Sequence, residues 1–390
     1  MTERKIRKKI QEFDFALFSL ILVLMGIGLL MVFSASSYYA MIRFNDRFYF
    51  VMRQSIYAGI GIVFMLVTSR IDYHFMGKIS PILAISGILM LAVVWIPGIG
   101  YKINGAYRWF NLGFTTVQPS EFMKIALILV LSFSLSQRHN KLKSFWSGLV
   151  PYLVMVMIID VALYQEPHMS GIVIITIIAC VLLIAAGAKF WHFLLVSIPA
   201  VILGGTLMLV EGYRLDRILT FIGKDTDPIG NSYQINNSLI AIGSGALFGK
   251  GLGRSLQKNL YIPEPQSDFI FSIAAEELGF VGAVTIIVLF VLLIFRGMRI
   301  AMNAPDMLGG LMGVGITSLF AIEAILNIAV VTKSIPTTGI PLPFFSSGGT
   351  SLILMFIAMG ILLNISRQTV PVFRATEMNT KLKKQPKFNN

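Results

Sequence analysis

The sequence contains little cysteine, little histidine and little charge, and each shortage excludes a class of protein or site. Its single cysteine, Cys180, lies inside an apolar run, so neither a disulfide framework nor a cysteine metal site is available. The four histidines are scattered without the spacing of a metal site, which argues against one. Charged residues make up 13% of the chain and hydrophobic residues 56%, and the mean hydropathy is +0.77. Such a composition cannot give a soluble globule a wettable surface.

What the chain has instead is long apolar runs. A bilayer core about 30 Å thick needs roughly 20 apolar residues for each helical span, because only helices and closed barrels satisfy every backbone group in hydrocarbon. The runs are uninterrupted, which favours helices over a barrel. We count ten runs, at roughly 16–36, 55–69, 80–97, 121–136, 148–164, 170–187, 190–210, 269–295, 308–332 and 349–365. The sequence therefore predicts an all-α polytopic membrane protein with about ten transmembrane helices.

Lysine and arginine are distributed unevenly over the connections between these runs. If the N-terminus is inside, basic residues of the tails and inner connections far outnumber those of the short outer connections, as is typical of cytoplasmic loops. This distribution predicts a basic cytoplasmic N-terminus over 1–14, a transmembrane domain over 15–368 and a basic, disordered cytoplasmic tail over 369–390. We interpret the net charge of +13 as anchoring to anionic lipid, so no nucleic acid partner is needed.

One connection is much longer than the others. Residues 211–268, between the seventh and eighth runs, form a polar, glycine-rich loop on the predicted outer side, and loops of this length are usually functional or disordered. An apolar patch within it, residues 239–248, is too short to span a membrane, and we expect it to lie in the interface or to cover a cavity. The mixed charges of the loop suit a polar, partly anionic ligand. The alternative is a solvated surface loop.

Some ionisable side chains lie within the apolar runs, where an acid or a lysine at the centre of a span costs about 2.5 to 3.5 kcal/mol. Glu121 and Lys124 are three residues apart and share one face of a helix. They form either a structural ion pair or part of a ligand site. Glu323 lies in the middle of the ninth run, where it needs a partner or a proton.

Asp268 closes a proline-rich segment, Pro263–Asp268, and opens the eighth run just below the predicted outer interface. A carboxylate in that place can be partly buried and still reachable from outside, so Asp268 is a candidate general base. The alternative is a helix N-cap, for which aspartate is among the best residues. Around the helix, Glu276 falls about 80° from Asp268 and can share its cavity, whereas Glu277 falls about 180° away.

The last connection, residues 335–349, reads IPTTGIPLPFFSSGG and combines prolines and glycines with hydrophobic residues. Irregular backbone near membrane depth is tolerated where it lines a cavity or is buried in protein. The segment is therefore a candidate re-entrant loop, and the alternative is a stiff exterior turn.

Several blocks of the sequence carry a resemblance to a known family. They are NGAYRWFNLG at 104–113, QPSEFMKIA at 118–126, EPHMSG at 166–171, YRLDRILTF at 213–221, YQINNSLIAIGSGALFGKGLG at 233–253, YIPEPQSDFIFSIAAEELGFVG at 261–282 and IPTTGIPLPFFSSGGTSL at 335–352. Together they resemble the SEDS family (shape, elongation, division and sporulation), over nearly all of residues 15–368. The residues of the loop block and of the PEPQSDFIF block are more similar to FtsW and SpoVE than to RodA. The chain departs from the usual family pattern at Tyr107, Glu323 and Ser347, where we expect arginine, glutamine and tyrosine.

The resemblance implies a peptidoglycan glycosyltransferase that polymerises lipid II into β-1,4 glycan strands with inversion at the anomeric carbon. Asp268 matches the family's essential aspartate and takes the role of general base for the acceptor hydroxyl. The residues implied to bind substrate are Arg108, Glu121, Lys124, Arg214, Arg217, Gln266, Glu276 and Ser346. Among them the basic residues would stabilise the departing pyrophosphate, Glu121 would orient Lys124, and Gln266 and Ser346 would contact sugar or peptide. A divalent cation, Mg²⁺ or Mn²⁺, would assist the pyrophosphate if one is used.

The resemblance also implies a partner and a place. Nothing in the sequence resembles a transpeptidase serine motif, so a class B penicillin-binding protein is the implied cross-linking partner. The place is the bacterial cytoplasmic membrane, with both termini in the cytoplasm, and the process is cell division or the synthesis of spore cortex or wall. Two alternatives stay open: a lipid II flippase, and a scaffold of the division or sporulation machinery without catalytic activity.

Overall fold

The computed structural model describes residues 13–96, 98–103, 106–113, 115–166, 168–189, 191–192, 221 and 231–369. Nearly all of the seventh apolar run and of both basic tails lies outside the described residues, as do Arg214 and Arg217. The total of ten helices, the first part of the long loop and the disorder of the C-terminal tail therefore stay predictions.

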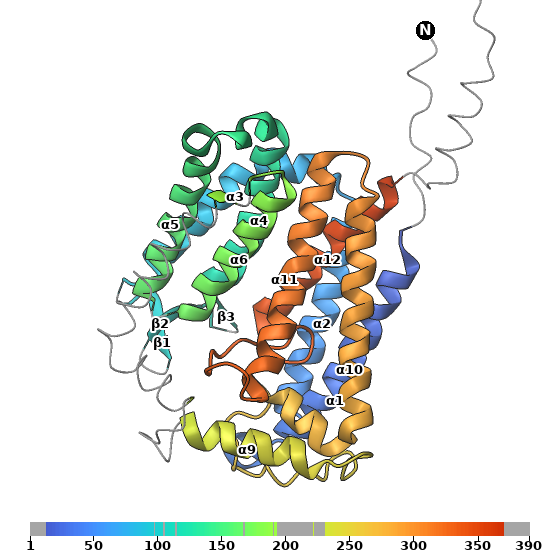
Figure 1. Cartoon of the computed structure of the whole chain (residues 1–390). Coiled ribbons are helices and arrows are strands. Elements are labelled where there is room, and N and C mark those ends of the chain that lie inside the picture. The colour runs from blue at the N-terminus through green and yellow to red at the C-terminus, as the bar shows by residue number, and fades with distance from the viewer. Residues whose placement is uncertain are drawn as a thin grey trace, which may run out of the picture.

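The described chain is a bundle of long apolar helices (Figure 1). Nine helices match nine of the predicted runs: α1 (Phe15–Phe44), α2 (Tyr49–Thr68), α3 (Tyr73–Val93), α4 (Pro119–Arg138), α5 (Val150–Gln165), α6 (Met169–Ala185), α10 (Ile270–Met302), α11 (Met307–Val331) and α12 (Gly349–Gln368). Within the described ranges, eight helical stretches are long and apolar enough to cross a membrane, and α6 is a shorter apolar helix. The predicted all-α polytopic architecture is confirmed.

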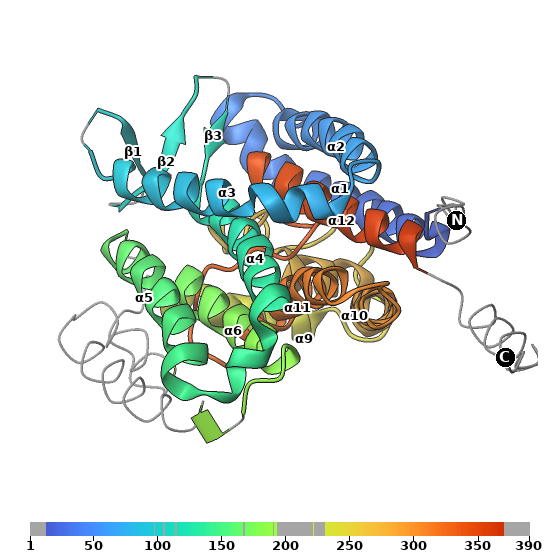
Figure 2. The same cartoon turned by 90° about the horizontal axis from the view of Figure 1, so that it is seen from above.

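A small antiparallel sheet between α3 and α4 was not predicted. Its strands are β1 (Gly100–Ile103), β2 (Ala106–Asn111) and β3 (Thr116–Val117), in the order β1-β2-β3. The sheet lies beside α2 and α3 at the edge of the bundle (Figure 2), and Thr350 of α12 donates a hydrogen bond to the main-chain oxygen of Thr116 (2.9 Å). The hairpin is thereby fixed against the start of α12. Two short helical segments, the 3-10 helix η2 (His139–Lys143) and the π-helix η3 (Phe145–Leu149), connect α4 to α5.

The helices divide into an interior set and an outer set. In their most apolar windows, α4 and α12 are 72% buried, whereas α2 and α10 are only 22% buried. Large apolar side chains such as Ile56 and Val63 on α2, and Val288 and Val291 on α10, are exposed. An outer surface of this kind suits hydrocarbon and would be a liability in water. The chain is an integral membrane protein.

Asp14 joins the two ends of the described chain. Its carboxylate accepts from the main-chain N–H of Leu17 and so caps α1 (2.9 Å), and it forms an ion pair with Arg296 of α10 (2.8 Å). Its own main-chain N–H donates to Ser366 Oγ near the end of α12 (3.1 Å). The start of α1 and the end of α12 therefore lie at the same end of the bundle, as an even number of crossings requires.

The helix α9 (Asn231–Ser244) lies across the opposite end of the bundle, nearly perpendicular to the long helices (Figure 1). It buries Ile235 and Ala241, and Ser238 Oγ donates to the main-chain oxygen of Val331 in α11 (2.7 Å). Its other face exposes Leu239 and Ile240. The first part of the apolar patch, residues 239–244, therefore belongs to a short helix that closes one end of the bundle, here called the α9 end.

The helix α10 is broken at Gly279, whose φ of 69° and ψ of −169° are not helical. The loop after α9 fills this break with main-chain hydrogen bonds. They run from Phe280 N to Ala246 O (2.8 Å), Val281 N to Leu247 O (3.1 Å), Lys250 N to Glu276 O (3.0 Å) and Gly251 N to Glu277 O (3.0 Å). The polar groups that a broken helix leaves exposed are thus satisfied by a second segment.

We expect Gly279→Ala to destabilise the protein by about 1–3 kcal/mol, because an alanine at this φ and ψ is strained. A Cβ at this position would also lie only 2.2 Å from the main-chain nitrogen of Gly249. The matched control is Gly59→Ala in α2, where nothing lies within 4 Å of the added Cβ. Thermal unfolding in detergent micelles measures both variants, and equal melting temperatures for the two would contradict the prediction.

Candidate active site

Asp268 lies at the α9 end, just before α10. Its side chain is half-buried, and its Oδ1 accepts a hydrogen bond from Ser267 Oγ (3.1 Å). Its main-chain oxygen accepts from Asn327 Nδ2 of α11 (2.8 Å). The N-cap position of α10 is held by Phe269, one residue after Asp268. A partly buried carboxylate at such a place can take part in chemistry.

The last connection, residues 332–348, is irregular and folds over Asp268. Asn327 Nδ2 also donates to the main-chain oxygen of Ile340 (2.7 Å), and Ser346 Oγ donates to that of Ser267 (2.7 Å). Gly339 has a φ of 67°, and a Cβ added there would lie 3.2 Å from Asp268 Oδ2. Because Ile340 and Phe344 are buried, the segment lies within protein, as expected for a re-entrant loop, and not as an exterior turn.

Lys124 forms a buried cluster with two carboxylates. Its ammonium bonds Glu121 Oε1 (2.7 Å), one turn away on α4, and also Glu323 of α11. The predicted pairing of Glu121 with Lys124 is confirmed, and Glu323 has found the partner it needs. Glu323 and Asn327 are four residues apart, so they share one face of α11. Lys124 bonds Glu323, and Asn327, one turn further along α11, bonds the main-chain oxygen of Asp268. The lysine and the aspartate are therefore linked through one face of α11.

Arg108 of β2 lies against the connection between α5 and α6. Its Nε donates to the main-chain oxygen of Glu166 (2.7 Å). Burial raises the pKa of Glu166 to about 8, although the charge of Arg108 opposes the shift. Burial and the positive charges of Arg108 and Lys124 lower the pKa of His168 to about 3. Both basic residues therefore act on one small region, in which His168 is neutral.

Sequence reasoning missed Glu166 and His168 as site residues. Both carboxylate oxygens of Glu166 and the Nδ1 atom of His168 are buried without a hydrogen-bond partner among the described residues. Ser170 Oγ donates to the main-chain oxygen of Thr338, which ties this connection to the loop over Asp268. The available signal was the EPHMSG block, in which an acid and a histidine stand together between two apolar runs.

Two further predicted residues, Gln266 and Ser346, lie next to Asp268. Gln266 is buried, and its side-chain oxygen has no partner within the described part of the chain. The hydroxyl of Ser346 accepts from Leu342 N (2.8 Å) and donates to Ser267 O, so it holds the loop. Their contacts with a substrate stay predictions, as do those of Arg214 and Arg217 outside the described residues.

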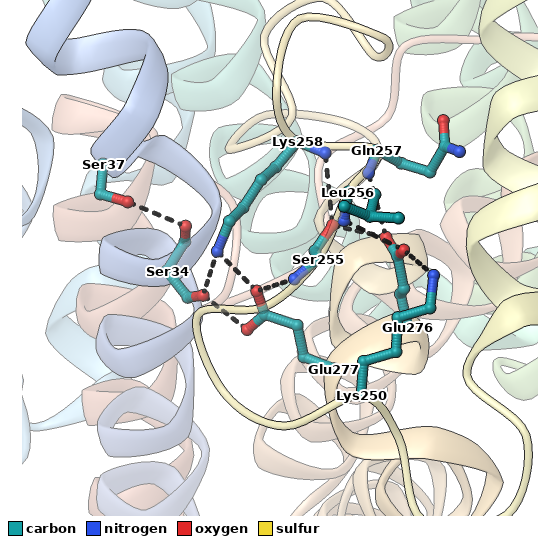
Figure 3. A network of polar contacts seen from close by, with 9 residues as sticks. All are labelled: Ser34, Ser37, Lys250, Ser255, Leu256, Gln257, Lys258, Glu276 and Glu277. Atoms are coloured by element: carbon teal, nitrogen blue, oxygen red, sulfur yellow. Dashed lines mark hydrogen bonds and ion pairs between the residues drawn. The ribbon is translucent and has the colours of Figure 1, made fainter.

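Glu276 contacts the loop after α9 (Figure 3), and the cavity predicted for it together with Asp268 stays a prediction. Its carboxylate is fully buried and bonds Lys250 Nζ (2.7 Å) and Ser255 Oγ (2.5 Å). Glu277 bonds Lys258 Nζ (2.8 Å) on the same loop. The rotation of 80° between the two acids is compatible with a common cavity, but the loop after α9 occupies the space beside Glu276. Its place in substrate binding stays a prediction, and its visible contacts are structural.

A cavity of about 240 Å³ opens beside the start of α12. It is lined by Tyr49, Phe50, Arg53, Gln54, Tyr57, Asn111, Gly113, Thr115, Thr116, Ser347, Gly348 and Gly349. The main-chain N–H of Ser347 donates to Gln266 O (2.8 Å), so the wall of the cavity adjoins the segment before Asp268. Ser347, where the sequence departs from the expected family pattern, is one of the residues that line this space.

The described residues contain no group of three histidine, cysteine, aspartate or glutamate side chains placed to hold a metal ion. A metal cage built from protein side chains alone is therefore not visible in that part of the chain. What the described site offers is a half-buried carboxylate, one guanidinium, one buried ammonium and several buried oxygens without partners. This combination suits a polar ligand that carries both hydroxyl groups and negative charge.

Known proteins resemble the chain over nearly its whole length. A family model for FtsW, RodA and SpoVE, described as "Cell cycle protein", matches residues 15–370. The stage V sporulation protein E of Bacillus subtilis is 43% identical, over 91% of this chain and 97% of that protein. A probable peptidoglycan glycosyltransferase FtsW of Trichlorobacter lovleyi is 42% identical, over 92% and 94%. A structure described as "Structural coordination of polymerization and crosslinking by a peptidoglycan synthase complex" shares the fold, with a TM-score of 0.76, 24% identity and coverage of 91% and 98%.

Proposed function

The chain belongs to the SEDS family of cell cycle proteins, close to FtsW and SpoVE, and from that premise we infer that it is a peptidoglycan glycosyltransferase. Its substrate in this proposal is lipid II, which it polymerises into β-1,4 glycan strands. The observation that carries the proposal is the half-buried carboxylate of Asp268. The main-chain oxygen of Asp268 accepts from Asn327, one turn along α11 from Glu323, which pairs with the buried Lys124. A base and a cation in one site are what transfer from a pyrophosphate-linked sugar needs.

The proposed reaction is a single displacement. Asp268 removes the proton from the 4-hydroxyl of the acceptor sugar as that oxygen bonds to the anomeric carbon of the donor. The bond from this carbon to the pyrophosphate breaks, and the lipid pyrophosphate leaves with the electron pair. Attack from the opposite face inverts the configuration, as one general base does in an inverting glycosidase. Arg108 and Lys124 stabilise the charge that develops on the pyrophosphate.

The test of this function is polymerisation of purified lipid II by the purified protein, read as glycan strands on a gel. Strands support the proposal. If lipid II instead crosses vesicle membranes and no polymer forms, the flippase takes its place. If neither occurs, with or without a penicillin-binding protein, the scaffold interpretation is favoured.

In this proposal both termini lie in the cytoplasm and the α9 end faces outward, where the polysaccharide is built. The partner is a class B penicillin-binding protein, because polymerised strands need a separate enzyme to cross-link them. The fold match to a peptidoglycan synthase complex supports an assembly of this kind. The process in this proposal is cell division or spore wall synthesis. The family model is described as a cell cycle protein, and one relative is named as a sporulation protein.

Glu166 gives the proposal a pH dependence. With a pKa of about 8, its carboxyl group is protonated at pH 7 and becomes negative as the pH rises through 8. The new charge beside Arg108 competes with the pyrophosphate for the guanidinium, so we expect KM for lipid II to rise above pH 8. Glu166→Gln mimics the protonated form and should keep the low KM at pH 9. The pH profiles of KM for the two proteins check this, and identical profiles would contradict it.

The use of a divalent cation stays part of the proposal. Mg²⁺ commonly takes only one or two protein carboxylates together with substrate phosphates, so a complete protein cage is not required. We expect EDTA to stop polymerisation and Mg²⁺ or Mn²⁺ to restore it. Strand synthesis that proceeds at the same rate in EDTA would remove the cation from the proposal.

A further inference from the structure

In the segment 245–261, which follows α9, polar side chains are buried and large apolar side chains are exposed, the reverse of what is usual in water. Ser255 and Lys258 are buried (2% and 4% exposed) and bond Glu276 and Glu277 in the network of Figure 3. The large apolar side chains exposed on this segment are Leu247, Phe248, Leu252, Leu256, Leu260 and Tyr261. In water the polar side chains would face outward and the apolar ones inward. The arrangement therefore indicates apolar surroundings.

The backbone of the segment is prepared for such surroundings. Irregular backbone is costly in hydrocarbon unless its polar groups are satisfied. The main-chain oxygens of Ala246 and Leu247 accept from α10 across the break at Gly279, and Gly249 N donates to Gly245 O (2.8 Å). The main-chain groups of the residues just before Phe248 are thus hydrogen-bonded to α10.

The depth of this part follows from α10. Phe280, which is bonded to Ala246, lies 16 residues before Arg296. At 1.5 Å per residue that distance is about 24 Å, which is less than the hydrocarbon thickness of about 30 Å. Arg296 pairs with Asp14 at the opposite end of the bundle and marks that boundary. The contact between the segment and α10 therefore lies within the apolar layer.

The exposed side chains of the segment continue the outer surface of α10. Phe248 is 81% exposed, and Phe280 of α10, whose main-chain N–H donates to the oxygen of Ala246, is 62% exposed. Val284 and Val288 extend the same surface along α10 towards the other end of the bundle. The exposed Arg254 of the segment suits the phosphates of lipid headgroups.

We propose that residues 245–261 insert into the membrane leaflet at the α9 end, with Phe248 in contact with lipid acyl chains. The segment is then a monotopic anchor that ends a few residues before Asp268. It fixes the depth of the catalytic segment relative to the headgroups. This inference goes beyond the proposed reaction, and it does not depend on whether the chain polymerises lipid II.

Spin labels test the insertion. Cys180→Ser removes the native cysteine, and Phe248→Cys or Leu252→Cys then carries the label in vesicles of phosphatidylethanolamine and phosphatidylglycerol. Val288→Cys in α10 is the reference for lipid, and Asp46→Cys in the exposed connection between α1 and α2 is the reference for water. The readout is the accessibility of each label to oxygen, which concentrates in lipid, and to a water-soluble nickel complex.

We expect the labels at 248 and 252 to follow the lipid reference, with an oxygen-to-nickel ratio severalfold above that at 46. Labels at 248 and 252 that follow the water reference would overturn the insertion. Labels shielded from both reagents would also overturn it, because a second copy of the chain would then cover the segment. Both substituted side chains are exposed, so the variants should fold as the parent does.

Discussion

Replacing Asp268 by alanine or asparagine is expected to lower the rate of glycan polymerisation by about 10²- to 10⁴-fold, the usual contribution of a general base. The loss arises because neither side chain can accept the proton of the acceptor hydroxyl. Asparagine keeps the size of the side chain, and the contact of Asn327 is made to the main-chain oxygen. We therefore expect Asp268→Asn to keep the melting temperature of the parent. The measurement is strand synthesis from lipid II by the purified protein with its partner.

The control for this prediction is Asp46→Asn, which removes an exposed carboxylate from the connection between α1 and α2. It should polymerise at the parent rate. If Asp268→Asn is folded and also polymerises at the parent rate, Asp268 is not the base. The reaction would then need another carboxylate, and Glu166 is the buried one whose oxygens lack partners among the described residues.

The positions of the helices along the chain could be predicted from the sequence, because a long apolar run indicates a segment surrounded by hydrocarbon. The runs starting near 16, 121 and 349 appear as α1, α4 and α12, although α1 continues to Phe44, well beyond the predicted end near 36. The sheet of residues 100–117 could not be predicted, since its strands are short and follow no long pattern of alternation. The break at Gly279 was also missed. The break depends on main-chain hydrogen bonds that α10 donates to the oxygens of Ala246 and Leu247, which lie far away in the sequence.

The candidate site was predictable where one helix carries the pattern, and less so where several segments meet. Glu121 and Lys124 are three residues apart on α4, so their pairing follows from helical geometry. Helical geometry also suggested that Glu276 faces Asp268, but it cannot show that Lys250 and Ser255 reach Glu276 first. Glu166 meets Arg108 because β2, which was not predicted, places that arginine against the connection between α5 and α6.

Removing the charge of Lys124 should have the largest effect on stability. Lys124→Met leaves Glu121 and Glu323 buried without a cation, and breaking a buried cluster in this way costs about 3–5 kcal/mol. We expect a correspondingly lower melting temperature in detergent and no polymerisation. Glu323→Gln is the matched control, because it keeps the pair of Lys124 with Glu121. That variant should stay folded and active.

A loss of activity in Lys124→Met alone does not separate a structural lysine from one that binds pyrophosphate. The triple variant Lys124→Met, Glu121→Gln, Glu323→Gln separates them, because it removes all three charges together. Neutral replacement of a buried ion cluster is often without cost, so the triple variant should regain most of the lost stability. If it is folded and still makes no strands, the ammonium acts on the substrate. If it polymerises at the parent rate, Lys124 only balances the two carboxylates, and Arg108 stabilises the pyrophosphate without it.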